Sequence, residues 1–303
     1  MSTDKTTSVP RNPWILAARP HTLPAAIAPV VVGAGLAVFD DVFRIDALVA
    51  ALIGALAIQV AANFANDASD AKRGADPEDR VGPPRAVATG LLTAKAVWTG
   101  VWIAFGVAAL AGIWMTIIAG WVIVAIGVLS IIATLGYVGG PVPYGYRGFG
   151  EVFVFLFFGV VATVGSRYVH DSSAPASAWQ LAIPMGCLVT AILVANNVRD
   201  IETDARVGKR TLAVILGRPR TVLLYQGLVG GAFLALASGV AWGAIPNGGL
   251  AGFVAIPFAI PLDRIIRREV DGPPLLTLLK GTARLQLTVA FLITTGLVVQ
   301  SYA

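Results

Sequence analysis

The chain carries nine long apolar runs, separated by short segments that hold nearly all of its charged residues. Runs of about 20 apolar residues can cross a bilayer as helices, which satisfy all of their backbone hydrogen bonds internally. The pattern therefore predicts an all-α, polytopic membrane protein with nine transmembrane helices. The third and fourth runs almost touch, which predicts a tight helical hairpin. The expected spans cover residues 22–38, 47–64, 97–112, 115–135, 152–169, 181–198, 222–242, 248–262 and 285–299.

Composition and charge support this interpretation. Of 303 residues, 56% are hydrophobic and only 13% are charged, against roughly 25% charged residues in soluble domains. If the spans alternate, all but two of the 22 basic residues lie on one side of the membrane, the exceptions being Arg44 and Arg167. The positive-inside rule then places the N-terminus in the cytoplasm and the C-terminus outside. We therefore expect a single domain, 1–303, in the cytoplasmic (inner) cell membrane, with a disordered N-terminus at 1–12 and no nucleic-acid partner.

Acidic residues gather at the predicted cytoplasmic ends of the second and sixth spans. The first motif is Asn63, Asp67 and Asp70, spaced i, i+4 and i+7, and the second is Asn196, Asp200 and Asp204, spaced i, i+4 and i+8. Such spacing puts the side chains of each motif on one face of a helix. Helix capping uses one residue per helix end and does not explain a duplicated pattern. The chain is therefore interpreted as two related halves, each with one acidic site.

Two facing stripes of oxygen ligands favour Mg²⁺, which prefers carboxylates and leaves positions for phosphate. The predicted metal ligands are the catalytic aspartates Asp67, Asp70, Asp200 and Asp204, together with Asn63. Basic residues follow both motifs, and Arg73, Lys209 and Arg210 are candidates to bind a diphosphate directly. The positive-inside rule also places cations here, so these residues either contact the substrate or only reflect the orientation of the chain in the membrane.

On these motifs the chain resembles the UbiA superfamily of intramembrane aromatic prenyltransferases. Residues 66–70 look like the NDxxD motif of that nine-helix fold, and residues 200–204 look like its DxxxD motif. Segments 18–24, 80–83, 137–141 and 146–148 are similar to the menaquinone branch. The resemblance implies Mg²⁺-dependent transfer of a polyprenyl group from a polyprenyl diphosphate to 1,4-dihydroxy-2-naphthoate. Loss of the acceptor carboxylate as CO₂ would then give demethylmenaquinone.

Further polar residues are candidates to hold the two substrates. Arg19 and Arg147 are candidates for the acceptor carboxylate, and tyrosine rings offer π-faces to an allylic cation. The predicted substrate-binding set is Asn63, Asn66, Arg73, Asn197, Lys209, Arg210, Arg19, Arg147, Tyr137 and Tyr146. Two alternatives stay open: a superfamily member with a different aromatic or tetrapyrrole acceptor, and a secondary transporter, which duplicated halves with intramembrane acids also indicate. The acids lie at one membrane face, whereas a transporter site lies near the midplane. The sequence leaves the isoprenoid length and the oligomeric state open.

Overall fold

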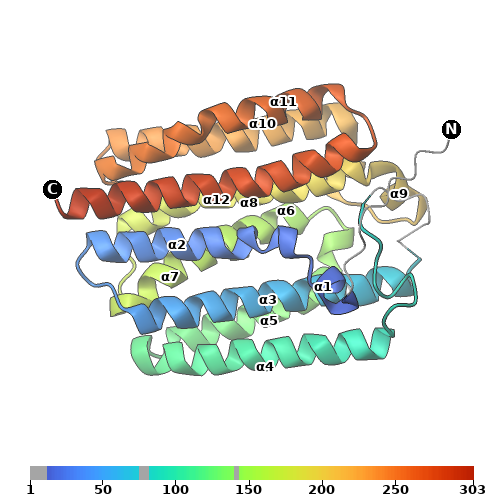
Figure 1. Ribbon diagram of the computed structural model, residues 1–303, viewed down its shortest axis with the longest axis horizontal. Coiled ribbons are helices and arrows are strands. Elements are labelled where there is room, and N and C mark those ends of the chain that lie inside the picture. Colours follow the sequence, from blue (N-terminus) through green and yellow to red (C-terminus); the bar gives the residue numbers. More distant parts are fainter. Residues whose placement is uncertain (1–11, 75–81, 140–142) are drawn as a thin grey trace.

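The computed structural model describes residues 12–74, 82–139 and 143–303, and the regular elements in these ranges are all helical. Residues 1–11 of the expected N-terminal tail lie outside the described residues, as do 80–81 and 140–141 of the branch-specific segments. The long helices run side by side in one bundle (Figure 1). In chain order the elements are α1 (Pro13–Ala18), η1 (Pro20–Thr22), α2 (Pro24–Phe39), α3 (Ile45–Lys72), α4 (Ala94–Ala119), α5 (Val122–Val138), η2 (Tyr144–Tyr146), α6 (Gly150–Val154), η3 (Phe155–Val161), α7 (Ala162–Asp171), α8 (Ala176–Arg199), α9 (Ile201–Arg206), α10 (Leu212–Ala241), η4 (Asn247–Ala255), α11 (Ile256–Arg268) and α12 (Pro273–Ser301).

The expected spans coincide with helical segments of this bundle, except that 115–135 begins inside α4 and continues through a turn into α5. Within the described ranges, seven helical segments are long and apolar enough to cross a membrane. A bent pair, α1–η1 followed by α2 at 49°, adds an eighth if it is one span. Helix α5 has 17 residues and is about 25 Å long, shorter than a hydrocarbon core of about 30 Å. The chain is therefore a multi-pass helical membrane protein, and nine spans stay a prediction.

The hairpin between α4 and α5 is tight, as expected, but its position differs from the prediction. The expected break at 113–114 lies inside α4, which continues to Ala119. The chain reverses at Gly120, whose φ of 83° is a conformation that favours glycine. Because apolar residues continue on both sides of this turn, hydrophobicity alone does not locate it.

The end of the bundle away from α9 holds a buried charged network. Arg167 is 2% exposed and donates to Asp40 at 2.8 Å and to Asp171 at 2.6 Å. The backbone N–H of Arg44 donates to Nδ1 of His170 at 3.0 Å. Thus the two basic residues expected to lie apart from the others lie together, at the end where the C-terminus also lies (Figure 1). Because the Arg167 side chain is buried, the carboxylates of Asp40 and Asp171 compensate a charge that would otherwise be costly in the bundle.

The core divides into groups that place the site between them. One cluster of buried apolar residues joins α2, α8, α10 and α12, and a second joins α1, α3, α4 and α5. The first acidic motif is carried by α3 and the second by the end of α8 and by α9. The site therefore forms where the two groups of helices face one another.

Candidate active site

The first motif lies on the last turns of α3, as expected. Asp67 is fully buried, and neither of its side-chain oxygens has a hydrogen-bond partner among the described residues. Asp70, 4% exposed, accepts a hydrogen bond from the Tyr146 hydroxyl and faces Arg85, whose Nη2 lies 3.8 Å from Oδ2. Two carboxylates one turn apart therefore differ, because only Asp70 accepts a hydrogen bond from a side chain.

The second motif is not on one continuous helix, contrary to the expectation from its spacing. Helix α8 ends at Arg199, Asp200 caps it, and Asp204 lies on the separate short helix α9. Arg199 donates to both oxygens of Asp200, from Nε at 2.7 Å and from Nη2 at 2.5 Å. This paired, planar contact compensates the charge of Asp200 where α8 ends.

Asp204 and Lys209 form the other ion pair of this motif, with Nζ 3.3 Å from Oδ1. Gly208, with φ of 73°, turns the chain so that the Lys209 N–H also donates to the Asp204 carbonyl at 2.9 Å. Burial raises the pKa of Asp204 to about 6, against the opposing effect of Lys209. Burial alone would lower the pKa of Lys209, but Asp70, Asp204 and Asp200 raise it above its ordinary value. Lys209 therefore interacts with carboxylates of both motifs.

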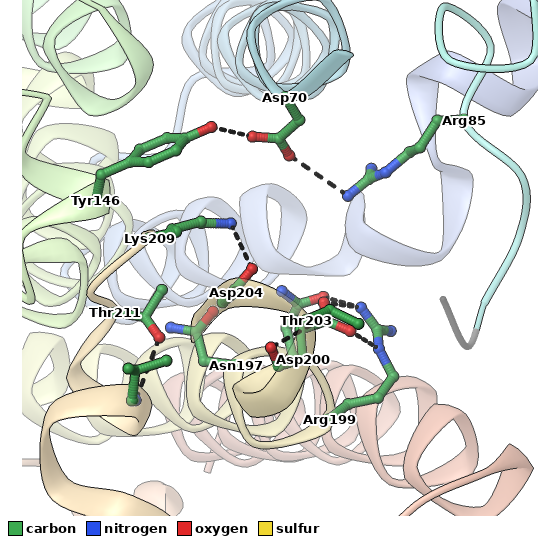
Figure 2. A network of polar contacts seen from close by, with 12 residues as sticks. Asp70, Arg85, Tyr146, Asn197, Arg199, Asp200, Thr203, Asp204, Lys209 and Thr211 are labelled. Carbon is green, nitrogen blue, oxygen red and sulfur yellow. Dashed lines mark hydrogen bonds and ion pairs between the residues drawn. The ribbon is translucent and has the colours of Figure 1, made fainter. Parts of the chain in front are cut away.

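Tyr146 lies between the two motifs: Figure 2 shows it bonded to Asp70, with Lys209, the partner of Asp204, nearby. Its hydroxyl donates to Asp70, Arg73 lies 4.2 Å from its ring centroid, and Lys209 lies 5.2 Å from it. Burial and then the Asp70 charge raise the pKa of the Tyr146 phenol. Because two cations already lie over this ring, Tyr146 is placed to organise the polar cluster, whereas the sequence suggested a free π-face.

The predicted asparagines have different surroundings. Nδ2 of Asn63 donates to the Ala18 carbonyl at 2.8 Å and to Thr22 at 2.9 Å, so this amide fixes the segment before α2. Nδ2 of Asn197 donates to Oε1 of Glu151 at 2.9 Å. Asn66 lines the cavity described next. The asparagines therefore support the polar cluster from several sides.

An apolar cavity of about 300 Å³ extends from this polar cluster into the bundle, between α2, α3, α4, α5, α7 and α8. Arg19, Asn66 and Tyr137 line its polar end. The π-helical segment η3 contributes Phe157 and Phe158 to its wall. A buried apolar cluster on α2, α3, α4, α5 and α7 lies at its other end. Such a space suits a long hydrocarbon chain whose polar head remains at the acidic motifs.

The remaining candidates differ in whether they line this cavity. Arg19 lines it, in the left-handed backbone conformation with φ of 50°. Arg147 is exposed and is not among the cavity residues, although it follows Tyr146 directly. Arg210 is also exposed, and its backbone N–H donates to the Tyr146 carbonyl at 3.1 Å. Arg19 is therefore better placed than Arg147 for an acceptor inside the cavity.

The donor set fits a hard divalent cation. In the part of the chain that the structure describes, no three Asp, Glu, His or Cys residues already converge in a metal-binding arrangement. However, both oxygens of Asp67 and Oδ2 of Asp204 are buried without hydrogen-bond partners. Buried carboxylate oxygens left open in this way carry a desolvation cost that an oxygen-binding cation removes.

Sequence reasoning missed Glu151 as a site residue, and it considered Arg85 and Arg199 only as cations flanking the motifs, without predicting their partners. Arg85 faces Asp70, Arg199 holds Asp200, and Glu151 holds Asn197. Glu151 is 6% exposed at the start of an apolar helix, and an acid in that position is itself a signal of function. The partners of Arg85 and Glu151 lie 15 and 46 residues away along the sequence (85 minus 70, and 197 minus 151), so sequence spacing gave no indication of them.

Comparisons with known proteins agree with this geometry. Residues 26–278 match the profile of the UbiA prenyltransferase family. The chain is 40% identical over 272 residues to the 1,4-dihydroxy-2-naphthoate octaprenyltransferase of Mycobacterium tuberculosis, covering 89% of this chain and 91% of that protein. It is 33% identical over 300 residues to the protein of the same name from Escherichia coli, covering 96% of each.

Solved structures show the same fold at low sequence identity. A UbiA homolog from Archaeoglobus fulgidus bound to GPP and Mg²⁺ has a TM-score of 0.69 at 14% identity, covering 94% of this chain and all of that one. The apo structure of a UbiA homolog from Aeropyrum pernix has a TM-score of 0.66 at 12% identity, covering 91% and 97%. With the match of the family profile and the curated relatives, the chain belongs to the UbiA prenyltransferase family.

Proposed function

We propose that this enzyme transfers a polyprenyl group from a polyprenyl diphosphate to 1,4-dihydroxy-2-naphthoate in menaquinone biosynthesis. The observation that carries the proposal is the match to 1,4-dihydroxy-2-naphthoate octaprenyltransferases over nearly the whole chain. In the reaction, the allylic C–O bond breaks and diphosphate leaves with the electron pair. A carbon of the naphthoate ring then bonds to the allylic carbon, and the acceptor carboxylate leaves as CO₂, giving demethylmenaquinol, the reduced (quinol) form of demethylmenaquinone.

The acidic motifs are proposed to hold the diphosphate end of the donor. Mg²⁺, when bound, supplies positive charge that stabilises the departing diphosphate. Its proposed ligands are Asp67, Asp70, Asp200, Asp204 and Asn63. The open oxygens of Asp67 and Asp204 support this assignment. The proposed direct diphosphate contacts are Arg73, Lys209 and Arg210, with Asn66 and Asn197 beside them.

The cavity is proposed to hold the prenyl chain and to exclude water from the allylic cation. Its apolar walls support this role, since hydrocarbon buried there avoids water at roughly 0.8 kcal/mol per CH₂ group. Tyr137 lines the polar end of the cavity, where its ring offers a π-face to the cation. Arg19 lines the same end and is proposed to bind the acceptor carboxylate through its planar guanidinium.

We further propose that the chain is one domain crossing the cytoplasmic membrane nine times, with the active site and N-terminus in the cytoplasm. The proposal counts α1–η1–α2 as one bent span and α5 as a short one. The asymmetric distribution of basic residues supports the orientation. In this arrangement, α9 faces the cytoplasm and the end of α12 faces outward, consistent with their places at opposite ends of the bundle (Figure 1).

The function is tested with the protein purified in detergent, supplied with Mg²⁺, octaprenyl diphosphate and one candidate ring at a time. We expect prenylated product and released diphosphate with 1,4-dihydroxy-2-naphthoate, loss of both with EDTA, and recovery on adding Mg²⁺. Asp204→Asn serves as the inactive control, because loss of this carboxylate should lower the prenyl-transfer rate at least about 100-fold. Prenylation of 4-hydroxybenzoate alone would overturn the acceptor, and no prenylation of any ring would overturn the enzymatic proposal.

A further inference from the structure

Glu151 lies beside the acidic motifs but belongs to neither. It occupies the first turn of α6, five residues after Tyr146 in the sequence, and is 6% exposed. Its Oε1 accepts the 2.9 Å hydrogen bond from Nδ2 of Asn197, which is itself 4% exposed. Asn197 lies on the last turn of α8, three residues before Asp200. Glu151 therefore contacts the second motif from a different helix.

The chemistry of this pair fixes the orientation of the amide. An ionised carboxylate has only acceptor oxygens, whereas an asparagine presents a donor on one side and an acceptor on the other. Glu151 therefore holds Nδ2 of Asn197 toward itself and turns Oδ1 away. In the other half, Nδ2 of Asn63 is likewise held by two oxygen acceptors, Ala18 O and Thr22 Oγ1. Both halves thus hold an asparagine amide nitrogen toward acceptors.

We propose that Glu151 is a positioning residue, which orients the Asn197 amide so that its Oδ1 faces a magnesium-bound diphosphate. This inference rests on the proposed function. Glu151 acts through Asn197 and does not itself contact substrate. An acid within an apolar helix costs free energy that a neutral side chain would avoid, and such residues commonly mark functional sites. Fixing one amide orientation is a task for which an acceptor-only group is better suited than a neutral amide.

Two substitutions and their combination separate positioning from packing. Glu151→Gln keeps size and shape but allows either amide orientation. The double variant Glu151→Gln/Asn197→Asp exchanges the carboxylate and the amide between the two positions, so that the amide at 151 now donates to the carboxylate at 197. The control is Asp263→Asn, since Asp263 accepts a 2.6 Å hydrogen bond from Gln226 outside the cavity and motifs, although it also pairs with Arg267. All variants are made in the full chain.

The first readout is binding of inorganic diphosphate with Mg²⁺, measured by calorimetry, with thermal unfolding measured alongside. The second is KM for prenyl diphosphate against KM for the naphthoate. We expect Glu151→Gln to weaken diphosphate binding and raise the KM for prenyl diphosphate about 10-fold or more, as for loss of a hydrogen bond to a charged group. The KM for the naphthoate and the properties of Asp263→Asn should not change. The double variant should recover thermal stability but not diphosphate affinity.

Unchanged diphosphate affinity in Glu151→Gln would overturn the proposal. Recovery of both stability and affinity in the double variant would also overturn it, because the pair would then serve packing only. The calorimetric readout is independent of prenyl transfer. If wild-type protein binds magnesium diphosphate but prenylates no ring, the proposed function fails while the role of Glu151 in diphosphate binding is still decided by calorimetry.

Discussion

Asp67 and Asp70 are one turn apart on α3, yet replacing each by asparagine should change stability in opposite directions. Asp67 is fully buried and no side chain donates a hydrogen bond to it, whereas Asp70 accepts from Tyr146 and faces Arg85. Asp67→Asn removes a charge that the metal-free protein stabilises poorly. Asp70→Asn removes a charge that two neighbouring groups stabilise. The two substitutions are chemically identical, so their different surroundings decide the outcome.

The expected magnitudes follow from these surroundings. An unpartnered buried polar group costs about 1–3 kcal/mol, and a charged one more. The charge of Arg19 and the nearby backbone N–H groups of Val87 and Ala86 offset part of that cost at Asp67. Because the asparagine amide is also unpartnered there, we expect Asp67→Asn to raise the free energy of unfolding by about 1 kcal/mol. Hydrogen bonds to charged groups contribute about 1.5–3 kcal/mol, so Asp70→Asn should lower it by about 2 kcal/mol. Each variant should lose at least about 100-fold in prenyl transfer.

The assay combines thermal unfolding in detergent with the prenyl-transfer rate, each measured with and without Mg²⁺ and diphosphate. Wild-type protein should be stabilised by these ligands, because they bind the folded state, and Asp67→Asn should be stabilised less. A lower unfolding temperature for metal-free Asp67→Asn would refute the reasoning, since the carboxylate would then have a stabilising partner. Retention of wild-type turnover would refute its assignment to the metal site.

Three further predictions concern the acceptor, the polar cluster and the topology. Arg19→Lys should raise the KM for 1,4-dihydroxy-2-naphthoate about 10- to 150-fold, because lysine lacks the planar guanidinium that binds a carboxylate through two hydrogen bonds. Replacing the exposed Arg147 by lysine should leave this KM unchanged, and equal KM values for the two variants would contradict the prediction. Tyr146→Phe should lower kcat/KM for prenyl diphosphate about 10-fold, because the hydrogen bond to Asp70 is lost. Tyr146→Leu should lower kcat/KM further, because Arg73 and Lys209 then also lose their contact with the aromatic ring; equal losses would show that the ring is unimportant. In a background without the native cysteine, Lys72→Cys should react with an impermeant thiol reagent from the cytoplasmic side and Tyr302→Cys from the outer side; the reverse labelling would invert the topology.

The sequence by itself determined the class of fold and the residue types of the site. Long apolar runs indicate membrane helices because the lipid environment acts on every residue of a span. The spacing of Asn63, Asp67 and Asp70 predicted a shared helix because helical periodicity relates residues one or two turns apart. The placement of Arg44 and Arg167 at the end of the bundle opposite to the motifs also followed from the order of spans. The family resemblance was confirmed by the family profile and curated relatives.

Only the tertiary structure decided which of these groups are partnered. The two aspartates of α3 are equivalent by spacing, but Tyr146, 76 residues from Asp70, reaches only that one. The break between Arg199 and Asp204 and the contact of Glu151 with Asn197 were likewise hidden from a reading based on periodicity. These features depend on which helices pack against one another and on which buried polar groups find a partner there. Such long-range packing leaves no local pattern in the sequence, whereas membrane spans and helix faces are visible as hydrophobic runs and as motif spacing.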